Sequence, residues 1–262
     1  TVGYHLSALY SPIGWMSWMQ IARAWEAAQG SDEAIKAFRN TTLGETWIET
    51  GEAPDWQRLY DRRETWKPGT VPAGGLFLTA GADVQKDRIE VDIWAWGRGF
   101  ESWLVDHVVI EGGPDRPDAW SDLTALLDRS WPHECGAYCK IARLAIDTGY
   151  EAPAVYAWSR KVGFAQVAPI KGVEGFNRSS PVSGPTFVDA TIGGKRLRRG
   201  ARLWTVAVST FKAETYRFLR LDRPTDEERA EGAVFPPGTI HLPKWVETEW
   251  LKQVVAEQLV TV

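Results

Sequence analysis

The chain has 262 residues and a mass of 29.3 kDa, enough for one large domain or one domain with appendages. Its composition, 44% hydrophobic and 24% charged, is ordinary for a globular protein; with no apolar run of eighteen residues and no signal peptide at the start, we expect no membrane partner. The net charge of −4 excludes a bulk polycation, and two cysteines exclude a disulfide framework and indicate a reducing compartment.

Residues 1–74 are predicted to form helices and a linker. An amphipathic helix after Pro12 is indicated by apolar residues at helical spacing, namely Trp15, Trp18, Ile21, Ala22 and Trp25. A second helix is expected over Ser31–Arg39, where serine and aspartate provide start signals. The polar, proline-bearing stretch from Trp47 to Gly75 reads as a linker. This part has no globular start of its own, so we expect a missing domain upstream.

Residues 75–262 are predicted to form an alternating α/β domain. Strands are expected at 76–83, 88–97 and 101–111, and the short breaks between them allow an antiparallel meander. A helix over 118–131, a strand over 141–147, a helix over 151–162 and a strand over 164–170, stopped by Lys171-Gly172, are expected next.

The last predicted elements are a loop over 172–186, two strands at 186–192 and 201–209 that flank a basic turn, and a helix over 210–221. Three antiparallel strands followed by helix, strand, helix and strand is the order of an RNase H-like α/β fold. We therefore predict a mixed central sheet flanked by helices, with an N-terminal helical and loop extension.

Two strand-like runs end in a single aspartate, Asp83 after 76–82 and Asp147 after 141–146. Carboxylates at strand ends in one open sheet are positioned to build a metal site. Hard cations such as Mg²⁺ prefer carboxylate oxygens together with substrate phosphates. A single aspartate in this position equally stops a strand or caps a helix, and it is the pair that indicates metal-assisted chemistry on phosphate.

Five segments resemble the nuclease half of lambda-type large terminase subunits, in collinear order from Gly3 to about Glu257. They are Gly3–Pro12, Ala80–Asp92, Ile146–Gly149, Pro169–Gly172, and His241–Pro243 with Gln253–Glu257. Members of that family cut concatemeric viral DNA and drive it into the procapsid. They join an N-terminal ATPase to a C-terminal nuclease of RNase H-like fold with a two-metal site.

The resemblance implies specific roles. Asp83 and Asp147 correspond to the first and second catalytic acids, which would bind two Mg²⁺ or Mn²⁺ ions. Lys171 is expected to offer its ammonium to a phosphate or to be a solvated turn lysine, and Lys212 matches a family lysine or is an ordinary helix lysine. The implied partners are double-stranded DNA, the ATPase domain, the small terminase subunit and the portal, in the host cytoplasm during phage assembly.

The chain departs from the family's pattern in two places. Ser209 stands where relatives often carry an acid. Relatives also continue into a further helix that supplies another acid, whereas this chain ends at Val262. Because two carboxylates hold two divalent cations poorly, Glu257 is the nearest substitute ligand, although a surface helix glutamate is the safer interpretation of this residue.

A basic cluster lies in the predicted turn between the last two strands, with five cations in eight residues: Lys195, Arg196, Arg198, Arg199 and Arg202. In an acidic protein such a cluster is the best candidate for contact with the DNA backbone, the alternative being a solvated hairpin tip. Nothing resembles a recognition helix, so site choice would fall to a partner such as the small subunit.

Three further observations bear on an ATP site, a zinc site and catalytic histidines. No phosphate-binding loop is present, so ATPase activity is not expected in this chain. His133, Cys135 and Cys139 lack a fourth zinc ligand, and free thiols are expected. The remaining histidines, His5, His107 and His241, lie beside apolar strands and are expected to pack.

The prediction is a metal-dependent DNA endonuclease domain of a phage packaging motor. Two alternatives stay open. One is another RNase H-like nuclease, such as a junction resolvase or a transposase core, because that fold reuses the same acids. The other is a non-catalytic DNA-binding or docking module. Ser209 in place of an acid and the early end of the chain favour this alternative.

Overall fold

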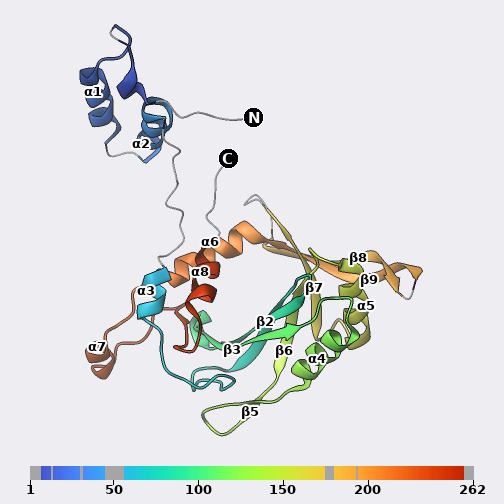
Figure 1. Ribbon diagram of the computed structural model, residues 1–262. Helices are drawn as coiled ribbons and strands as arrows, with labels where there is room; N and C mark the ends of the chain where they lie inside the picture. Colours follow the sequence, from blue (N-terminus) through green and yellow to red (C-terminus); the bar gives the residue numbers. More distant parts are fainter. Residues whose placement is uncertain are drawn as a thin grey trace. The chain divides into compact units, whose positions relative to one another are not determined.

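The computed structural model describes residues 7–12, 14–29, 32–44, 56–174, 180–192 and 194–256. The chain divides into two compact units, Thr1–Gly51 with Val260–Val262, and Glu52–Leu259. Among the described residues, no helix has the length and apolar character needed to span a bilayer. Figure 1 shows the ribbon of both units, and each is described by itself.

The first unit contains the short helix η1 (Ala8–Tyr10), α1 (Trp18–Ala28), α2 (Asp32–Phe38) and the turn η2 (Arg39–Leu43). Both predicted helices are therefore present. The first begins at Trp18, because Ser17 and Gln20 form a reciprocal capping box. Ile21 is buried against the second helix, but Trp15 and Trp18 are 81% and 74% exposed, so the expected tryptophan face is mostly not covered in this unit.

The larger unit is built on a meander of three antiparallel strands, β1 (Phe77–Val84), β2 (Arg88–Trp96) and β3 (Ser102–Glu111). Their bounds confirm the predicted strands within one residue. β1 and β2 alternate buried and more exposed positions, as a sheet with one well-covered face requires.

The chain then alternates between helix and parallel strand: α4 (Pro117–Asp128), β6 (Ile141–Asp147), α5 (Ala152–Val162) and β7 (Val167–Val173). The prediction was wrong at β7, which begins at Val167 and continues through Lys171 and Gly172. Between α4 and β6 lies a small hairpin of β4 (Trp131–Pro132) and β5 (Tyr138–Cys139), which was not predicted.

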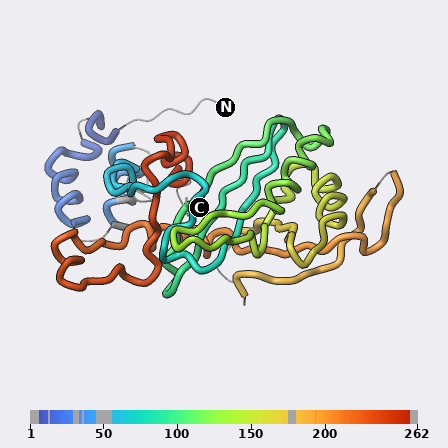
Figure 2. Tube along the Cα trace, turned by 90° about the horizontal axis from the view of Figure 1, so that it is seen from below, coloured from blue at the N-terminus to red at the C-terminus, as the bar shows by residue number. Residues whose placement is uncertain are grey.

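The sheet ends in a long ribbon of β8 (Val182–Ile192) and β9 (Lys195–Ala207), followed by α6 (Val208–Leu219). The ribbon reaches past the other strands (Figure 2). The expected loop over 172–186 is thus shorter, and the basic cluster lies on β9 itself instead of in a turn. A β-hairpin rich in polar and basic residues shows little apolar periodicity, which explains why the two strands were predicted shorter than they are.

The complete sheet has eight strands in the order β10-β3-β2-β1-β6-β7-β9-β8. Its edge strand β10 (Ile240–His241) pairs in parallel with β3. The mixed sheet with helices around it confirms the predicted α/β architecture and is consistent with a nuclease domain of RNase H-like type. The remaining short elements of this unit are η3 (Arg98–Phe100) and α7 (Asp226–Ala230).

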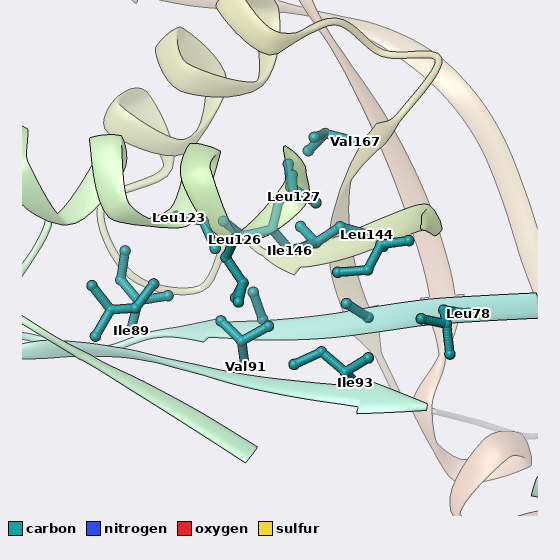
Figure 3. Packing of buried hydrophobic residues seen from close by; sticks show 14 of the residues in the cluster. Leu78, Ile89, Val91, Ile93, Leu123, Leu126, Leu127, Leu144, Ile146 and Val167 are labelled. Atoms are coloured by element: carbon teal, nitrogen blue, oxygen red, sulfur yellow. The ribbon is translucent and has the colours of Figure 1, made fainter. Parts of the chain in front are cut away.

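One face of the sheet carries the main core. α4 and α5 cover this face, and Figure 3 shows leucines of α4 packed on the central strands. The fully or nearly fully buried residues include Leu78, Ile89, Val91, Ile93, Leu123, Leu127, Leu144 and Ile146. Side chains along a β-strand point alternately to the two faces, so the residues of β1 and β6 between these buried ones point to the opposite face.

The opposite face is covered over β2, β3 and β10, and the start of α6 lies against β7, where a Cβ atom on Gly172 would be 2.7 Å from Val208. On this face α3 (Trp56–Asp61), α6 and α8 (Thr248–Ala256) bury a second core with Leu59, Leu104, Leu219 and Leu251. The stretch from Trp47 to Gly75 was expected to be a linker, yet its described part contains α3 and belongs to this core. Its apolar positions are too few for a periodicity signal, and their partners are distant in sequence: Leu59 packs in the second core and Val71 in the main core.

A buried histidine on β10 links this second layer to the sheet through two hydrogen bonds. His241 on β10 is 1% exposed, with Nδ1 at 2.6 Å from Glu64 Oε1 and Nε2 at 2.8 Å from Glu101 Oε1. Its ring stacks on Trp103 at 4.9 Å between centroids. Burial alone would raise the pKa of Glu64, but hydrogen bonds from His241 and Arg223 outweigh it and leave that pKa below its usual value.

We expect Leu59→Ala to lower the free energy of unfolding by about 2–5 kcal/mol, because it leaves a cavity between α3 and the sheet. Urea unfolding followed by tryptophan fluorescence measures this change. The matched control is Leu76→Ala, whose side chain is 63% exposed and whose loss should be within about 0.5 kcal/mol. Equal stability of the two variants would show that α3 is not part of the core.

Candidate active site

The two aspartates lie side by side on neighbouring parallel strands. The β1–β6 register pairs Ala82 with Ile146, so Asp83 and Asp147 are the next residues along each strand. Ala82 and Ile146 face the core, and alternation therefore directs both carboxylates to the opposite face. Since adjacent strands are about 4.8 Å apart, the pairing brings the two predicted acids together.

Each carboxylate is held by a local hydrogen bond through one oxygen. Asp83 Oδ2 accepts a bond from Gln85 Nε2 at 3.1 Å, and Asp147 Oδ2 accepts one from the backbone N–H of Gly149 at 2.8 Å. Among the described residues, neither Oδ1 has a hydrogen-bond partner. Each carboxylate is thus oriented by the hydrogen bond to its Oδ2, and its Oδ1 is available to a ligand.

The turn after Asp147 is fixed by close contacts. Thr148 is buried and bonds the carbonyl of Ile170 on β7 through both its N–H, at 3.0 Å, and its hydroxyl, at 2.8 Å. A Cβ atom on Gly149 would lie 2.7 Å from Asp147 Oδ2, so only glycine leaves that oxygen in place. The strand end therefore has a set geometry.

The space over the acids is open. A Cβ atom on Gly81, two residues before Asp83 on the same face, would meet no heavy atom within 4 Å. α3 and α8 lie over β2, β3 and β10, and α6 begins over β7 beside Gly172, two residues past Ile170, the β7 partner of Asp147. The position beside Asp83 on this face is therefore free of protein atoms at the distance of a methyl group.

The donor set fits a hard divalent cation in chemistry but is incomplete in number. Asp83 and Asp147 offer carboxylate oxygens, which Mg²⁺ and Mn²⁺ prefer. In the part of the chain that the structure describes, however, no three His, Cys, Asp or Glu residues gather as a metal-binding group. The pair would hold a cation together with water and phosphate oxygens.

The sequence reasoning missed a third carboxylate in the same row. Glu90 on β2 is the direct cross-strand partner of Asp83, and it forms an ion pair with Arg88 at 2.6 Å. Like charges directly opposite each other in a sheet are destabilising, and the arginine offsets this repulsion. The signal was available in the alternation of charged residues along Arg88–Asp92.

A histidine–aspartate pair lies two residues farther along the same face. His107 Nδ1 on β3 is 2.7 Å from Asp92 Oδ1 on β2, and Asp92 pairs with Gly81 across the sheet. The hydrogen bond that His107 donates to Asp92 raises the pKa of His107, against the lowering effect of partial burial. His107 and His241 are packed as predicted, whereas His5 lies outside the described residues.

Register places Arg202 on the acid face. Asp147 pairs with Ile170 on β7, and Ile170 pairs with Trp204 on β9, so all three side chains share one face. Arg202 is two residues before Trp204 and points the same way. Arg143, two alternate positions before Asp147 on β6, lies 5.1 Å from the Trp204 ring centroid and supports this assignment.

Arg196 reaches the same face across a bulge. Arg202 pairs with Phe187 and Arg196 pairs with Thr191, two β8 residues whose separation of four puts them on one side. The Arg196 guanidinium bonds Asp189, which also accepts the backbone N–H of Arg199 at 3.0 Å. The other members of the cluster, Lys195, Arg198 and Arg199, are exposed on the ribbon.

The other predicted site residues are more scattered. Lys171 is exposed on β7, where alternation turns it away from the face of Asp147. Lys212 is half-buried in the first turn of α6, and Ser209 is buried at the same helix start. Glu257 lies outside the described residues. A phosphate contact by either lysine and a metal contact by Glu257 stay predictions.

The zinc alternative finds no support among the described residues. His133 uses both ring nitrogens locally: Nε2 lies 2.8 Å from the Gly75 carbonyl, and Nδ1 accepts the N–H of Cys135 at 3.0 Å. Cys135 and Cys139 are free thiols, as predicted. Burial raises the pKa of the Cys139 thiol, which makes it a poor metal ligand at neutral pH.

Comparisons with known proteins identify related sequences. The family model described as terminase large subunit gpA, endonuclease domain, matches residues 1–262. The chain is 34% identical over 245 residues to the terminase large subunit of Escherichia phage lambda, covering 93% of this chain and 35% of that protein. It is 34% identical over 263 residues to the terminase large subunit of Enterobacteria phage P21, covering 99% and 38%. The chain spans little more than a third of both relatives.

We expect Gly149→Ala to push the Asp147 carboxylate out of position and to weaken Mn²⁺ binding about tenfold or more. Isothermal titration calorimetry measures the affinity directly. The control is Gly81→Ala, because a methyl group there meets nothing and should leave Mn²⁺ affinity unchanged. Unchanged affinity in Gly149→Ala would remove Asp147 from the metal site.

We expect the imidazole of His107 to titrate above about 6.5, the ordinary histidine value, and to return toward it in Asp92→Asn. A raised pKa in the folded state means that the pair stabilises the fold fully below about pH 6.5 and loses this contribution as pH rises through the raised pKa. NMR titration of the imidazole protons measures the pKa. Asp122→Asn, on α4 behind the sheet, is the control and should not shift it.

Proposed function

The chain belongs to the family of terminase large subunit gpA endonuclease domains, and we propose that it cuts concatemeric phage DNA by metal-dependent hydrolysis of phosphodiester bonds. The observation that carries the proposal is the parallel pairing that sets Asp83 beside Asp147 on an open sheet face. Two-metal nucleases need such a carboxylate pair, with space above it for the scissile phosphate.

In this proposal Asp83 and Asp147 hold Mg²⁺ or Mn²⁺ through the carboxylate oxygens that have no partner among the described residues. The bound cations would lower the pKa of water and offset the charge that builds up at phosphorus and on the departing 3′ oxygen. Gln85 and Gly149 keep the carboxylates oriented before substrate arrives, which lowers the cost of assembling the site. The open space over Gly81 admits the phosphate.

The basic ribbon would bind the DNA backbone on the same face. Arg196 and Arg202 are directed to the side of the sheet that carries the acids, and Lys195, Arg198 and Arg199 surround them. Contacts to phosphate position the duplex without reading its sequence. Selection of the cutting site would then depend on the small terminase subunit, and DNA movement on the ATPase domain and the portal, in the host cytoplasm during assembly.

A non-catalytic DNA-binding or docking module is the second candidate. It is favoured by one observation, that no group of three potential metal ligands forms within the described ranges. Ser209 at the start of α6 adds no acid. Metal-dependent cleavage distinguishes the two functions, because a docking module needs the basic ribbon but no metal.

We expect the wild-type chain to nick or linearise supercoiled plasmid with Mn²⁺ or Mg²⁺ and not with EDTA. Asp83→Asn and Asp147→Asn should each lower the rate by about a hundredfold or more, because one metal-binding carboxylate is lost. Agarose gel electrophoresis over time gives the rates. The matched control is Asp122→Asn, an exposed acid on α4 behind the sheet, which should cut like the wild type.

Cleavage by both aspartate variants at the wild-type rate would contradict the proposal. A wild type that binds plasmid in gel shifts but never cuts would favour the docking module, provided that a longer chain with the residues after Val262 is also inactive. Cleavage by the longer chain alone would instead place a required acid beyond this segment.

A further inference from the structure

Aromatic rings and arginines gather on the acid face beyond Asp147. Trp204 is in register with Ile170 and Asp147, and Phe187 lies across from Arg202 on the edge strand β8. The Arg202 guanidinium is 5.6 Å from the Phe187 ring centroid, and Arg143 is 5.1 Å from that of Trp204. Register and these contacts agree that the rings belong to the face that carries the acids.

Phe187 is largely exposed although its ring lies beside the Arg202 guanidinium, which is also 5.8 Å from the Phe164 ring centroid. The Phe187 side chain is 57% exposed, while the residues on the other side of the ribbon, such as Ala190 and Ala201, are buried at 3% and 1%. Those small residues lie on the side of the ribbon that packs against α5, so the ribbon is held to the domain by side chains other than Phe187. A single exposed aromatic residue is common, but this one is flanked by cations on the face of the acids.

The combination of ring and cation matches a nucleic acid strand with accessible bases. Phosphate binding needs only the arginines, and a duplex keeps its bases stacked inside the helix, where Phe187 cannot reach their faces. Unpaired bases stack on aromatic side chains without sequence preference, and arginines beside the ring bind the neighbouring phosphates. The ring therefore adds affinity only for an unpaired strand.

The geometry also gives the length of strand involved. β6, β7, β9 and β8 are consecutive in the sheet, so Asp147 and Phe187 are separated by three inter-strand spacings, about 15 Å. An extended single strand crosses that distance in a few nucleotides. Arg202 lies between the two points, on β9, and can contact a phosphate along the way.

We propose that Phe187, with Arg202 and Trp204, forms a stacking platform for an unpaired DNA strand that runs from the acid pair to the edge of the sheet. The platform rests on the proposed DNA-directed function and adds a substrate class, DNA that is locally single-stranded next to the cut. It holds the strand a few nucleotides from the scissile phosphate.

The test is fluorescence anisotropy in EDTA, so that binding is separated from cutting. The probes are labelled oligothymidine, an abasic oligonucleotide of the same length, and a duplex. Phe187→Ala should weaken oligothymidine binding about tenfold, which corresponds to one lost stacking contact, and should change abasic-strand and duplex binding less than about twofold. Phe187→Trp should restore binding to oligothymidine, because indole also stacks on bases.

The control is Tyr138→Ala, which removes a ring of similar exposure, 73%, from the β4–β5 hairpin and should leave all three affinities unchanged. An equal loss for the three probes in Phe187→Ala, or no loss for oligothymidine, overturns the platform. The outcome is independent of the plasmid assay. If cleavage depends on metal and on Asp83 but Phe187→Ala does not change oligothymidine binding, the nuclease function stands and the platform is wrong. If Phe187→Ala weakens oligothymidine binding but no cleavage is seen, the platform stands and the nuclease function is wrong.

Discussion

The parallel pairing of β1 with β6 is the constraint on which the site depends. The two strands are separated in sequence by the rest of the meander and by α4, and only their pairing puts Asp83 beside Asp147. A shift of one residue would turn one of the two carboxylates into the core. That shift is prevented by the burial of Ala82 and Ile146, which stabilises the sheet and aligns the acids by the same contacts.

The unequal covering of the two sheet faces separates stability from chemistry. α4 and α5 close one face with leucines and valines, whereas the other is closed only where α3, α6 and α8 reach it. His241 joins this partial layer to β3 through Glu64 and Glu101. The acid pair and the ribbon are left on the uncovered part, so residues there are free to serve a ligand at little cost to the core.

Strands with strict alternation and clear turn signals could be predicted from the sequence, as β1, β2, β3 and β6 show. The pair of strand-end aspartates could be predicted as well, because strand order and polarity follow from the element order. The membership of α3 in the core could not, since Leu59 finds its partners on α6 and α8, far away in the sequence. Nor could the side of the sheet on which Arg196 lies, because the bulge opposite Asp189 changes the alternation of β9.

If the chain acts as proposed, the arrangement of charge on the acid face would separate capture of DNA from cutting. A carboxylate pair repels phosphate until a divalent cation offsets its charge, so the approach of the scissile phosphate depends on metal. Arg202 is two inter-strand spacings from Asp147 and two residues along β9, about 12 Å in all, which is longer than the screening length at physiological salt. In the proposed function the ribbon cations would attract DNA almost independently of the acids, so that an acidic protein with a net charge of −4 would hold its substrate before the site is ready to cut.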